Sequence, residues 1–298
     1  MNLNTSIEHK FIYEHLTNDS TPIGIVHISH GMAEHIGRYN WLIKKLNNDG
    51  FHVISIDHAG HGRRIGPNMK GYLANSNSWK QVINDQLTLV NETKKKFPHL
   101  KQYMIAHSMG SWIALEAIQA GMKIDGLILS GSSKSTDRLI KIQKILISVV
   151  LFFSSKKRKG KFLDALILGK YNKFFKPNRT KKDWISSDSS NVDEYVKDPL
   201  CGYIVTNGLW HDLVNGISNV FQQDGYKNVD ISMPIFIISG SNDPVGENGK
   251  GVKRLYVYLK NIFTNVSIAI IPNARHEVFS EIDKEKNYKL LKIFIDKR

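Results

Sequence analysis

The chain contains a series of short, nearly continuous apolar runs, separated by longer segments in which apolar residues recur at helical spacing. Runs of this kind are typical of strands buried on both faces of a parallel sheet. They predict strands at residues 23–29, 51–56, 102–106, 126–129, 234–239 and 266–271, with an earlier edge strand at 10–14. Helical spacing predicts helices at residues 39–48, 79–96, 112–120, 251–259 and 284–294. This alternation indicates an α/β fold built from right-handed βαβ units.

The alternation stops after Gly131 and resumes only at Pro234. The interval is about a hundred residues, which is too long for a plain crossover between two strands. We therefore predict a single domain over residues 1–298, with a helical cap inserted at approximately 132–210 and followed by a helix that packs on the main body. A chain of 298 residues without an obvious internal repeat fits one large domain of this kind.

A serine lies between small residues where the predicted strand 102–106 gives way to a helix. The segment reads Ala106-His107-Ser108-Met109-Gly110. A strand, a serine with small neighbours and a helix form the setting of a nucleophile elbow, a turn that holds the serine hydroxyl away from the backbone. In such sites the backbone N–H after the serine, here that of Met109, is one of two donors to the oxyanion.

Candidate partners for Ser108 follow two later strands. Asp243 lies in a turn after one predicted strand, and His276 lies in the loop after the next. The order Ser, Asp, His at the ends of successive strands is that of the α/β-hydrolase fold. In this arrangement His276 takes the proton of Ser108, while Asp243 orients the imidazole and stabilises its cation. Met32, after the first buried strand, is the predicted second oxyanion donor.

Each of these features also has a purely structural explanation. A small-x-Ser-x-Gly segment occurs by chance, an Asp-Pro pair after a strand is usually a turn, and a loop histidine usually faces solvent. The joint occurrence of all three, in order and at strand ends, favours catalysis. His58 and His61 could suggest a metal pair, but a glycine-rich turn explains them better, and no further Cys/His cluster in the sequence supports zinc. The sequence also lacks a dinucleotide or phosphate-binding glycine motif, so we predict no metal and no cofactor.

Six segments spread over nearly the whole chain carry a family resemblance. They are residues 30–39 (HGMAEHIGRY), 57–62 (DHAGHG), 106–110 (AHSMG), 198–202 (DPLCG), 240–244 (GSNDP) and 273–277 (NARHE). Together they resemble the monoacylglycerol lipase and lysophospholipase branch of the α/β-hydrolase family, among the serine aminopeptidase S33-like hydrolases. The first and third segments are specific to this branch. The resemblance implies a cofactor-free serine hydrolase that acts on ester bonds of monoacyl lipids.

The resemblance also implies that Glu34, Arg38 and His107 lie near the polar head of the substrate. A structural alternative is that Glu34 and Arg38 pair with each other and hold the oxyanion loop. The chain departs from the family at Ala106, where glycine is usual, and at Ser111, where a second glycine is frequent. Alanine is small enough for a tight turn, so the prediction for the nucleophile is unchanged.

Positive charge is concentrated in one part of the chain. The net charge is +14, and residues 134–182 hold 15 Lys or Arg against 2 Asp, or +13, which leaves +1 for the rest. This basic segment is either a solvated face or a surface attracted to anionic lipid headgroups or nucleic acid. It contains no recognisable nucleic-acid-binding module, so we predict no nucleic-acid partner.

Apolar residues also recur at helical spacing inside the basic segment, from Leu139 to Val149, and continue to Phe153. An amphipathic helix with basic flanks is typical of a helix that lies on a membrane surface. It also fits a lid over an acyl channel, or a cap helix packed on the main body. The longest apolar run is far shorter than the roughly 20 residues of a membrane span.

The sequence thus predicts a serine esterase that cleaves a fatty-acyl ester of a monoacylglycerol or lysophospholipid through an acyl-enzyme. The alternatives are a short-chain carboxylesterase or peptidase on the same scaffold, and a non-catalytic lipid-binding module tethered by its basic cap. The single cysteine, Cys201, excludes an internal disulfide and indicates a reducing compartment, and residues 1–9 do not resemble a signal peptide. We expect a cytoplasmic protein with peripheral contact to an anionic membrane surface through the cap.

Overall fold

The computed structural model describes residues 8–66, 69–75 and 78–297. Within these residues the chain forms a seven-stranded sheet in the order β1-β3-β2-β4-β5-β6-β7. β1 is antiparallel to β3, and all other neighbouring strands are parallel. The strands are β1 (Ile12–His15), β2 (Gly24–Ser29), β3 (Phe51–Ile56), β4 (Gln102–His107), β5 (Gly126–Ser130), β6 (Ile235–Gly240) and β7 (Val266–Ile271).

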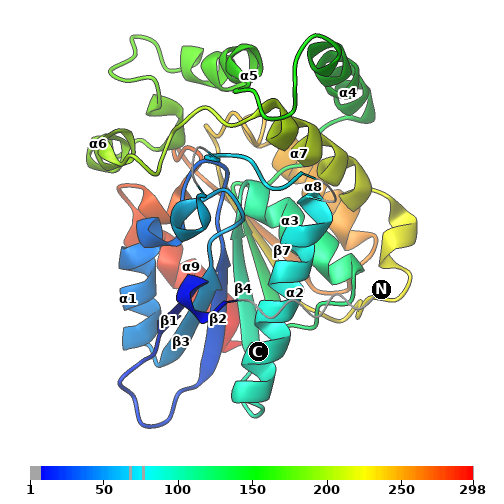
Figure 1. Ribbon diagram of the computed structural model, residues 1–298. Helices are drawn as coiled ribbons and strands as arrows, with labels where there is room; N and C mark the ends of the chain where they lie inside the picture. Colours follow the sequence, from blue (N-terminus) through cyan, green and yellow to red (C-terminus); the bar gives the residue numbers. More distant parts are fainter. Residues whose placement is uncertain (1–7, 67–68, 76–77, 298) are drawn as a thin grey trace.

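Helices cover both faces of the sheet (Figure 1). The apolar sides of α1 and α9 pack on one face, and those of α2, α3, α7 and α8 belong to the core on the other. The helices are α1 (Asn40–Asn48), α2 (Ser78–Lys96), α3 (Met109–Gln119), α4 (Asp137–Phe152), α5 (Lys161–Lys173), α6 (Ser189–Lys197), α7 (Asn207–Val220), α8 (Lys250–Lys260) and α9 (Lys284–Asp296). This arrangement confirms the predicted α/β-hydrolase fold.

The six predicted parallel strands are all present, and β3 and β7 have the predicted bounds. Every residue of β2, β3, β4, β5 and β6 is buried, which explains why their sequences are almost continuously apolar. β7 is only partly buried because it forms the edge of the sheet. The predicted edge strand at 10–14 is β1, displaced by one to two residues.

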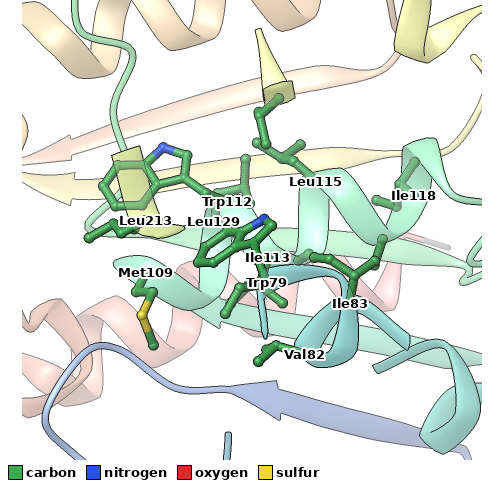
Figure 2. Close-up of a cluster of buried hydrophobic side chains, with 14 of the residues drawn as sticks. Trp79, Val82, Ile83, Met109, Trp112, Ile113, Leu115, Ile118, Leu129 and Leu213 are labelled. Carbon is green, nitrogen blue, oxygen red and sulfur yellow. The ribbon is translucent and has the colours of Figure 1, made fainter. Parts of the chain in front are cut away.

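The core next to Ser108 is formed by three helices that meet over the sheet. Figure 2 shows Trp79 of α2, Trp112 of α3 and Leu213 of α7 in one cluster with Met109 and Leu129. All five side chains are buried. The first turn of α3, which follows Ser108, is therefore anchored in the core.

The interval between β5 and β6 forms α4, α5, the short 3-10 turn η4 (Asp183–Ile185), α6, α7 and a second short 3-10 turn, η5 (Gln223–Tyr226). α4, α5 and α6 lie beyond the carboxyl ends of the strands, and α7 runs back over α2 and α3 (Figure 1). Only Ile140 and Ile147 of α4 are buried, whereas most of α7 is. Over the described residues no helix has the length and apolarity required to cross a membrane. Of residues 1–9, which were examined above for a signal peptide, residues 1–7 lie outside this part of the chain.

Candidate active site

Ser108 occupies a tight turn between β4 and α3. Its φ is 49° and its ψ is −119°, a conformation that is unfavourable for a residue with a side chain. Its backbone N–H donates to the carbonyl of Ser130 at 2.9 Å, and the residue remains partly exposed in an otherwise buried segment. Gly110 allows this close packing, because a β-carbon at that position would lie 2.1 Å from the carbonyl oxygen of Ser29. The geometry is that of a nucleophile elbow.

The two departures from the family pattern fit into this turn. Ala106 is fully buried at the end of β4. The hydroxyl of Ser111 lies 2.5 Å from the carbonyl oxygen of Ser108 and 2.7 Å from the hydroxyl of Ser132. Ser111 therefore links the start of α3 to the loop after β5, a contact that glycine would lack.

His276 and Asp243 lie together at the same edge of the sheet. Nδ1 of His276 is 3.0 and 3.1 Å from the two carboxylate oxygens of Asp243. Asp243 is fully buried and also accepts hydrogen bonds from the Ser239 hydroxyl at 3.0 Å and the Val245 backbone N–H at 2.9 Å. Three donors thus hold the carboxylate, and Nδ1 of the imidazole carries a proton that points at it.

Opposing effects act on the pKa of His276. Burial lowers it, but the charge and hydrogen bond of Asp243, together with Glu277 and Glu34, outweigh burial, and the net pKa is raised above its usual 6.5. The imidazole ring lies against His107, with ring centroids 4.6 Å apart, and against Trp184 of η4, at 5.1 Å. Burial and the charge of His276 hold the pKa of His107 well below its usual range, so His107 is neutral.

The loop after β2 approaches Ser108 from the other side. Gly31, Met32 and Met109 line the same pocket as Ser108 and His276. The Gly31 N–H donates to the carboxylate of Glu34 at 2.5 Å, and the Tyr39 hydroxyl donates to the same oxygen at 2.9 Å. Glu34 therefore holds the loop that carries the predicted oxyanion donor Met32. Burial and the nearby Glu277 raise the pKa of Glu34 to about 7.

Arg38 pairs with Glu277 rather than with Glu34. Its Nη2 lies 2.5 Å from the Glu277 carboxylate and 2.8 Å from the side-chain oxygen of Asn191. The predicted alternative, in which Glu34 and Arg38 pair to hold the loop, is therefore not the arrangement observed. Arg38, Glu34 and His107 line a small cavity of about 320 Å³ beside the main pocket. The structure thus brings together the three residues that were predicted to lie near the substrate head.

The main pocket has an empty volume of about 690 Å³ and is formed jointly by the body and the segment above it. Ser108, His276 and the oxyanion loop form its floor, and Trp210 and Leu213 of α7 lie at its side. α5, η4 and α6 contribute a further part of the wall, formed by Ile167, Leu168, Tyr171, Trp184, Ile185 and Tyr195. None of the lining residues comes from α4, so α5 rather than α4 forms part of the pocket wall.

His58 and His61 form part of a buried turn. Asp57 in this turn accepts hydrogen bonds from the Tyr13 hydroxyl at 2.7 Å and the Ile36 and Arg63 backbone at 2.9 and 2.8 Å. The turn therefore joins β1, β3 and the oxyanion loop, in line with a structural role for its glycines. Among the described residues, the atoms that come closest to a metal-ligand set are elsewhere, in His35, Asp198 and Cys201.

The side chains of His35 and Asp198 pair with each other, and the Cys201 backbone N–H donates to the Asp198 carbonyl at 3.0 Å. Nε2 of His35 lies 2.8 Å from the carboxylate of Asp198, and the Gly37 N–H donates to Nδ1 of His35 at 3.2 Å. The proton of the imidazole is therefore on Nε2 and is donated to Asp198. The His35–Asp198 hydrogen bond links the oxyanion loop to the segment after α6.

Comparison with known proteins agrees with this geometry. Residues 20–283 match the family described as serine aminopeptidase, S33. The chain belongs to this family.

Individual proteins are similar to this chain over most of their length. The monoacylglycerol lipase of Mycolicibacterium smegmatis is 25% identical over 94% of each chain. A probable lysophospholipase L2 of Haemophilus influenzae is 24% identical over 92% of this chain and 84% of its own. Among solved structures, a thermostable carboxyl esterase from Bacillus coagulans, in complex with glycerol, superposes with a TM-score of 0.80. It is 27% identical and covers 95% of this chain and 94% of its own.

Several residues that line this candidate site were not identified from the sequence. Glu277 directly follows His276, and this position next to the predicted base is the sequence feature that could have identified it. Tyr171, Lys182 and Trp184 come from the inserted segment, where weak periodicity gives no indication of which side chains face the pocket. Only the three-dimensional path of α5 and η4 reveals them.

Proposed function

We propose that this protein is a serine esterase that cleaves the fatty-acyl ester of a monoacylglycerol or lysophospholipid. The observation that carries the proposal is the strained Ser108 turn, open to a largely apolar pocket that also contains His276 paired with Asp243. The monoacylglycerol lipase and lysophospholipase among the relatives support the same substrate class.

In the proposed mechanism the hydroxyl oxygen of Ser108 attacks the ester carbonyl carbon while Nε2 of His276 takes the hydroxyl proton. The backbone N–H groups of Met32 and Met109 stabilise the negative oxygen of the tetrahedral intermediate. The C–O bond to the alcohol then breaks, and His276 gives the proton to the departing oxygen. Water, activated by the same imidazole, attacks the acyl-serine and releases the fatty acid. Asp243 keeps the Nδ1 proton in place throughout.

The pocket suggests how the two ends of the substrate are distinguished. Ile167, Leu168 and Tyr171 of α5 offer an apolar wall suited to an acyl chain. Glu34, Arg38 and His107 provide polar groups on the other side, where the alcohol would leave. We assign residues 132–210 to a cap that completes this pocket.

The cap also presents apolar side chains to solvent. Phe152 is 83% exposed, Phe153 78%, Ile145 66% and Phe162 60%. They lie on α4 and α5 and between them, within the segment of charge +13. Exposed aromatic residues surrounded by lysines are typical of a surface that inserts shallowly into an anionic membrane. We infer peripheral binding of this kind for a protein of the cytoplasm.

A fluorophosphonate probe tests the reaction. The wild-type protein should be labelled, Ser108→Ala should not, and Ser111→Ala, a neighbouring serine, should keep its label. A folded wild-type protein that resists the probe would refute the proposal. A series of glycerol and p-nitrophenyl esters of increasing acyl length then separates a lipase from a short-chain carboxylesterase, and peptide substrates test the peptidase alternative.

Vesicle flotation tests the membrane surface. The double variant Phe152→Ser/Phe153→Ser should bind anionic vesicles more weakly than wild type, with Ile282→Ser, exposed on the body at 71%, as the control. Equal binding of all three proteins, or binding that ignores lipid charge, would argue against contact through the cap.

A further inference from the structure

Lys182 stands out among the residues of the active-site pocket. It immediately precedes η4, it is half-buried, and its side chain lines the pocket that contains Ser108 and His276. In the part of the chain that the structure describes, its ammonium group has no hydrogen bond and no carboxylate within ion-pair distance. Burial lowers its pKa, while Asp164 of α5 acts in the opposite direction from a longer distance.

The position of Lys182 is close to the predicted head-group residues. A β-carbon built on Gly202 would lie 3.3 Å from Cε of Lys182 and 2.9 Å from the ring of Tyr195, so both side chains flank this glycine. The Tyr195 hydroxyl donates to the carbonyl of Ala33 in the oxyanion loop, and the Arg38 guanidinium lies 4.8 Å from the ring centroid. Lys182 is thus placed on the side of the pocket where the alcohol part of the ester would lie.

The carboxylates on this side of the pocket, those of Glu277 and Glu34, do not pair with the ammonium group of Lys182. Glu277 is already paired with Arg38 and accepts a further hydrogen bond from Asn191 at 2.8 Å. Glu34 is committed to the Gly31 N–H and the Tyr39 hydroxyl, and its raised pKa leaves it partly protonated near neutral pH. Asp164 acts on the ammonium of Lys182 only from beyond ion-pair distance, so this positive charge lines the substrate pocket without a carboxylate in direct contact.

We propose that the pocket prefers a monoacyl lipid with an anionic head, the phosphate of a lysophospholipid, over a neutral monoacylglycerol, with Lys182 as the counter-charge. The proposal rests on the proposed esterase function and narrows its substrate class. A lipid that fills the pocket removes water from the ammonium group, and a glycerol head would leave that charge without compensation. A phosphate oxygen forms a charge-assisted hydrogen bond instead. The bond that breaks is still the acyl ester, and the phosphate is not attacked.

The test compares substrates that share one short acyl chain and are used as monomers, below their micelle concentrations. They are lysophosphatidylglycerol and lysophosphatidic acid, which are anionic, and the matching monoacylglycerol. The proteins are wild type, Lys182→Gln, Lys182→Arg, and Lys181→Gln as a matched control. Lys181 is the exposed neighbour, so its loss changes the net charge equally. The quantity measured is the ratio of kcat/KM for the anionic substrate to that for the neutral one.

Wild type should favour the anionic substrates, and Lys182→Gln should lower the ratio about tenfold or more, the usual effect of losing one hydrogen bond to a charged group. Lys182→Arg should keep the preference, and Lys181→Gln should leave the ratio unchanged. A wild-type preference for monoacylglycerol, or equal effects of the two glutamine variants, would overturn the proposal. So would a Lys182→Gln variant that keeps the ratio but relieves inhibition by the free fatty acid, since Lys182 would then bind the product carboxylate. If no ester is cleaved at all, the esterase function itself fails.

Discussion

The carboxylate of Asp243 offers the sharpest test of the proposed mechanism. In the Asp243→Asn variant one oxygen becomes an NH₂ group. The Val245 N–H needs an acceptor at Oδ1, so the nitrogen must take the Oδ2 position, beside the Ser239 hydroxyl and 3.1 Å from Nδ1 of His276. The amide can then donate to Nδ1, which favours the tautomer whose proton is on Nε2. That tautomer cannot accept the proton of Ser108.

In serine proteases the corresponding change lowers kcat by about 10⁴-fold, equivalent to about 5 kcal/mol of transition-state stabilisation at ~1.4 kcal/mol per factor of ten. The same logic applies here because Asp243 is fully buried and water cannot replace the lost charge. We expect a loss of 10³ to 10⁴ in kcat/KM for a p-nitrophenyl ester, with slower fluorophosphonate labelling. Asp224→Asn, on an exposed side chain, should have no effect. A folded Asp243→Asn protein within tenfold of wild type would refute the assignment.

Three further predictions concern the surroundings of this pair. Catalysis requires a neutral His276, and the pKa of His276 is raised, so kcat/KM should increase with pH with a midpoint above 6.5. A midpoint at or below 6.5 would contradict the pairing of His276 with Asp243. Gly110→Ala should lower the free energy of unfolding by about 1–3 kcal/mol or more, measured by urea denaturation. Gly169→Ala, at an open helical position, should leave the free energy of unfolding unchanged or raise it. Equal effects of the Gly110→Ala and Gly169→Ala variants would contradict the close packing of Gly110 against Ser29. Arg38→Met leaves Glu277 buried without its cation and should cost about 3–5 kcal/mol; unchanged thermal unfolding would argue against the buried pair.

The strands and the predicted catalytic residues could be located from sequence for one physical reason. A parallel sheet must bury both faces, so the sequences of its strands are nearly continuous apolar runs. The residues that directly follow these strands lie at one edge of the sheet. Asp243 and His276 were found in this way, although 33 positions separate them. The structure then brings them within hydrogen-bond distance.

The pocket-lining residues of the proposed cap were harder to predict. Tertiary contacts, rather than the periodicity of the sequence, determine which of its side chains face the pocket. Apolar residues recur at helical spacing in α4, yet α5 rather than α4 lines the pocket. The contact between His35 and Asp198 spans 163 positions, and that between Arg38 and Glu277 spans 239. Neither the spacing nor the local propensity of these residues specifies such pairs.

The conformation of Ser108 lowers the stability of the fold, but the proposed reaction requires a serine at this position. At φ 49° a residue with a β-carbon costs roughly 1–3 kcal/mol, a strain that glycine would largely avoid. A glycine here would therefore give a more stable protein that cannot form an acyl-enzyme. Selection for heat resistance alone would remove this serine, so engineering for stability has to hold residue 108 constant and seek its gains elsewhere.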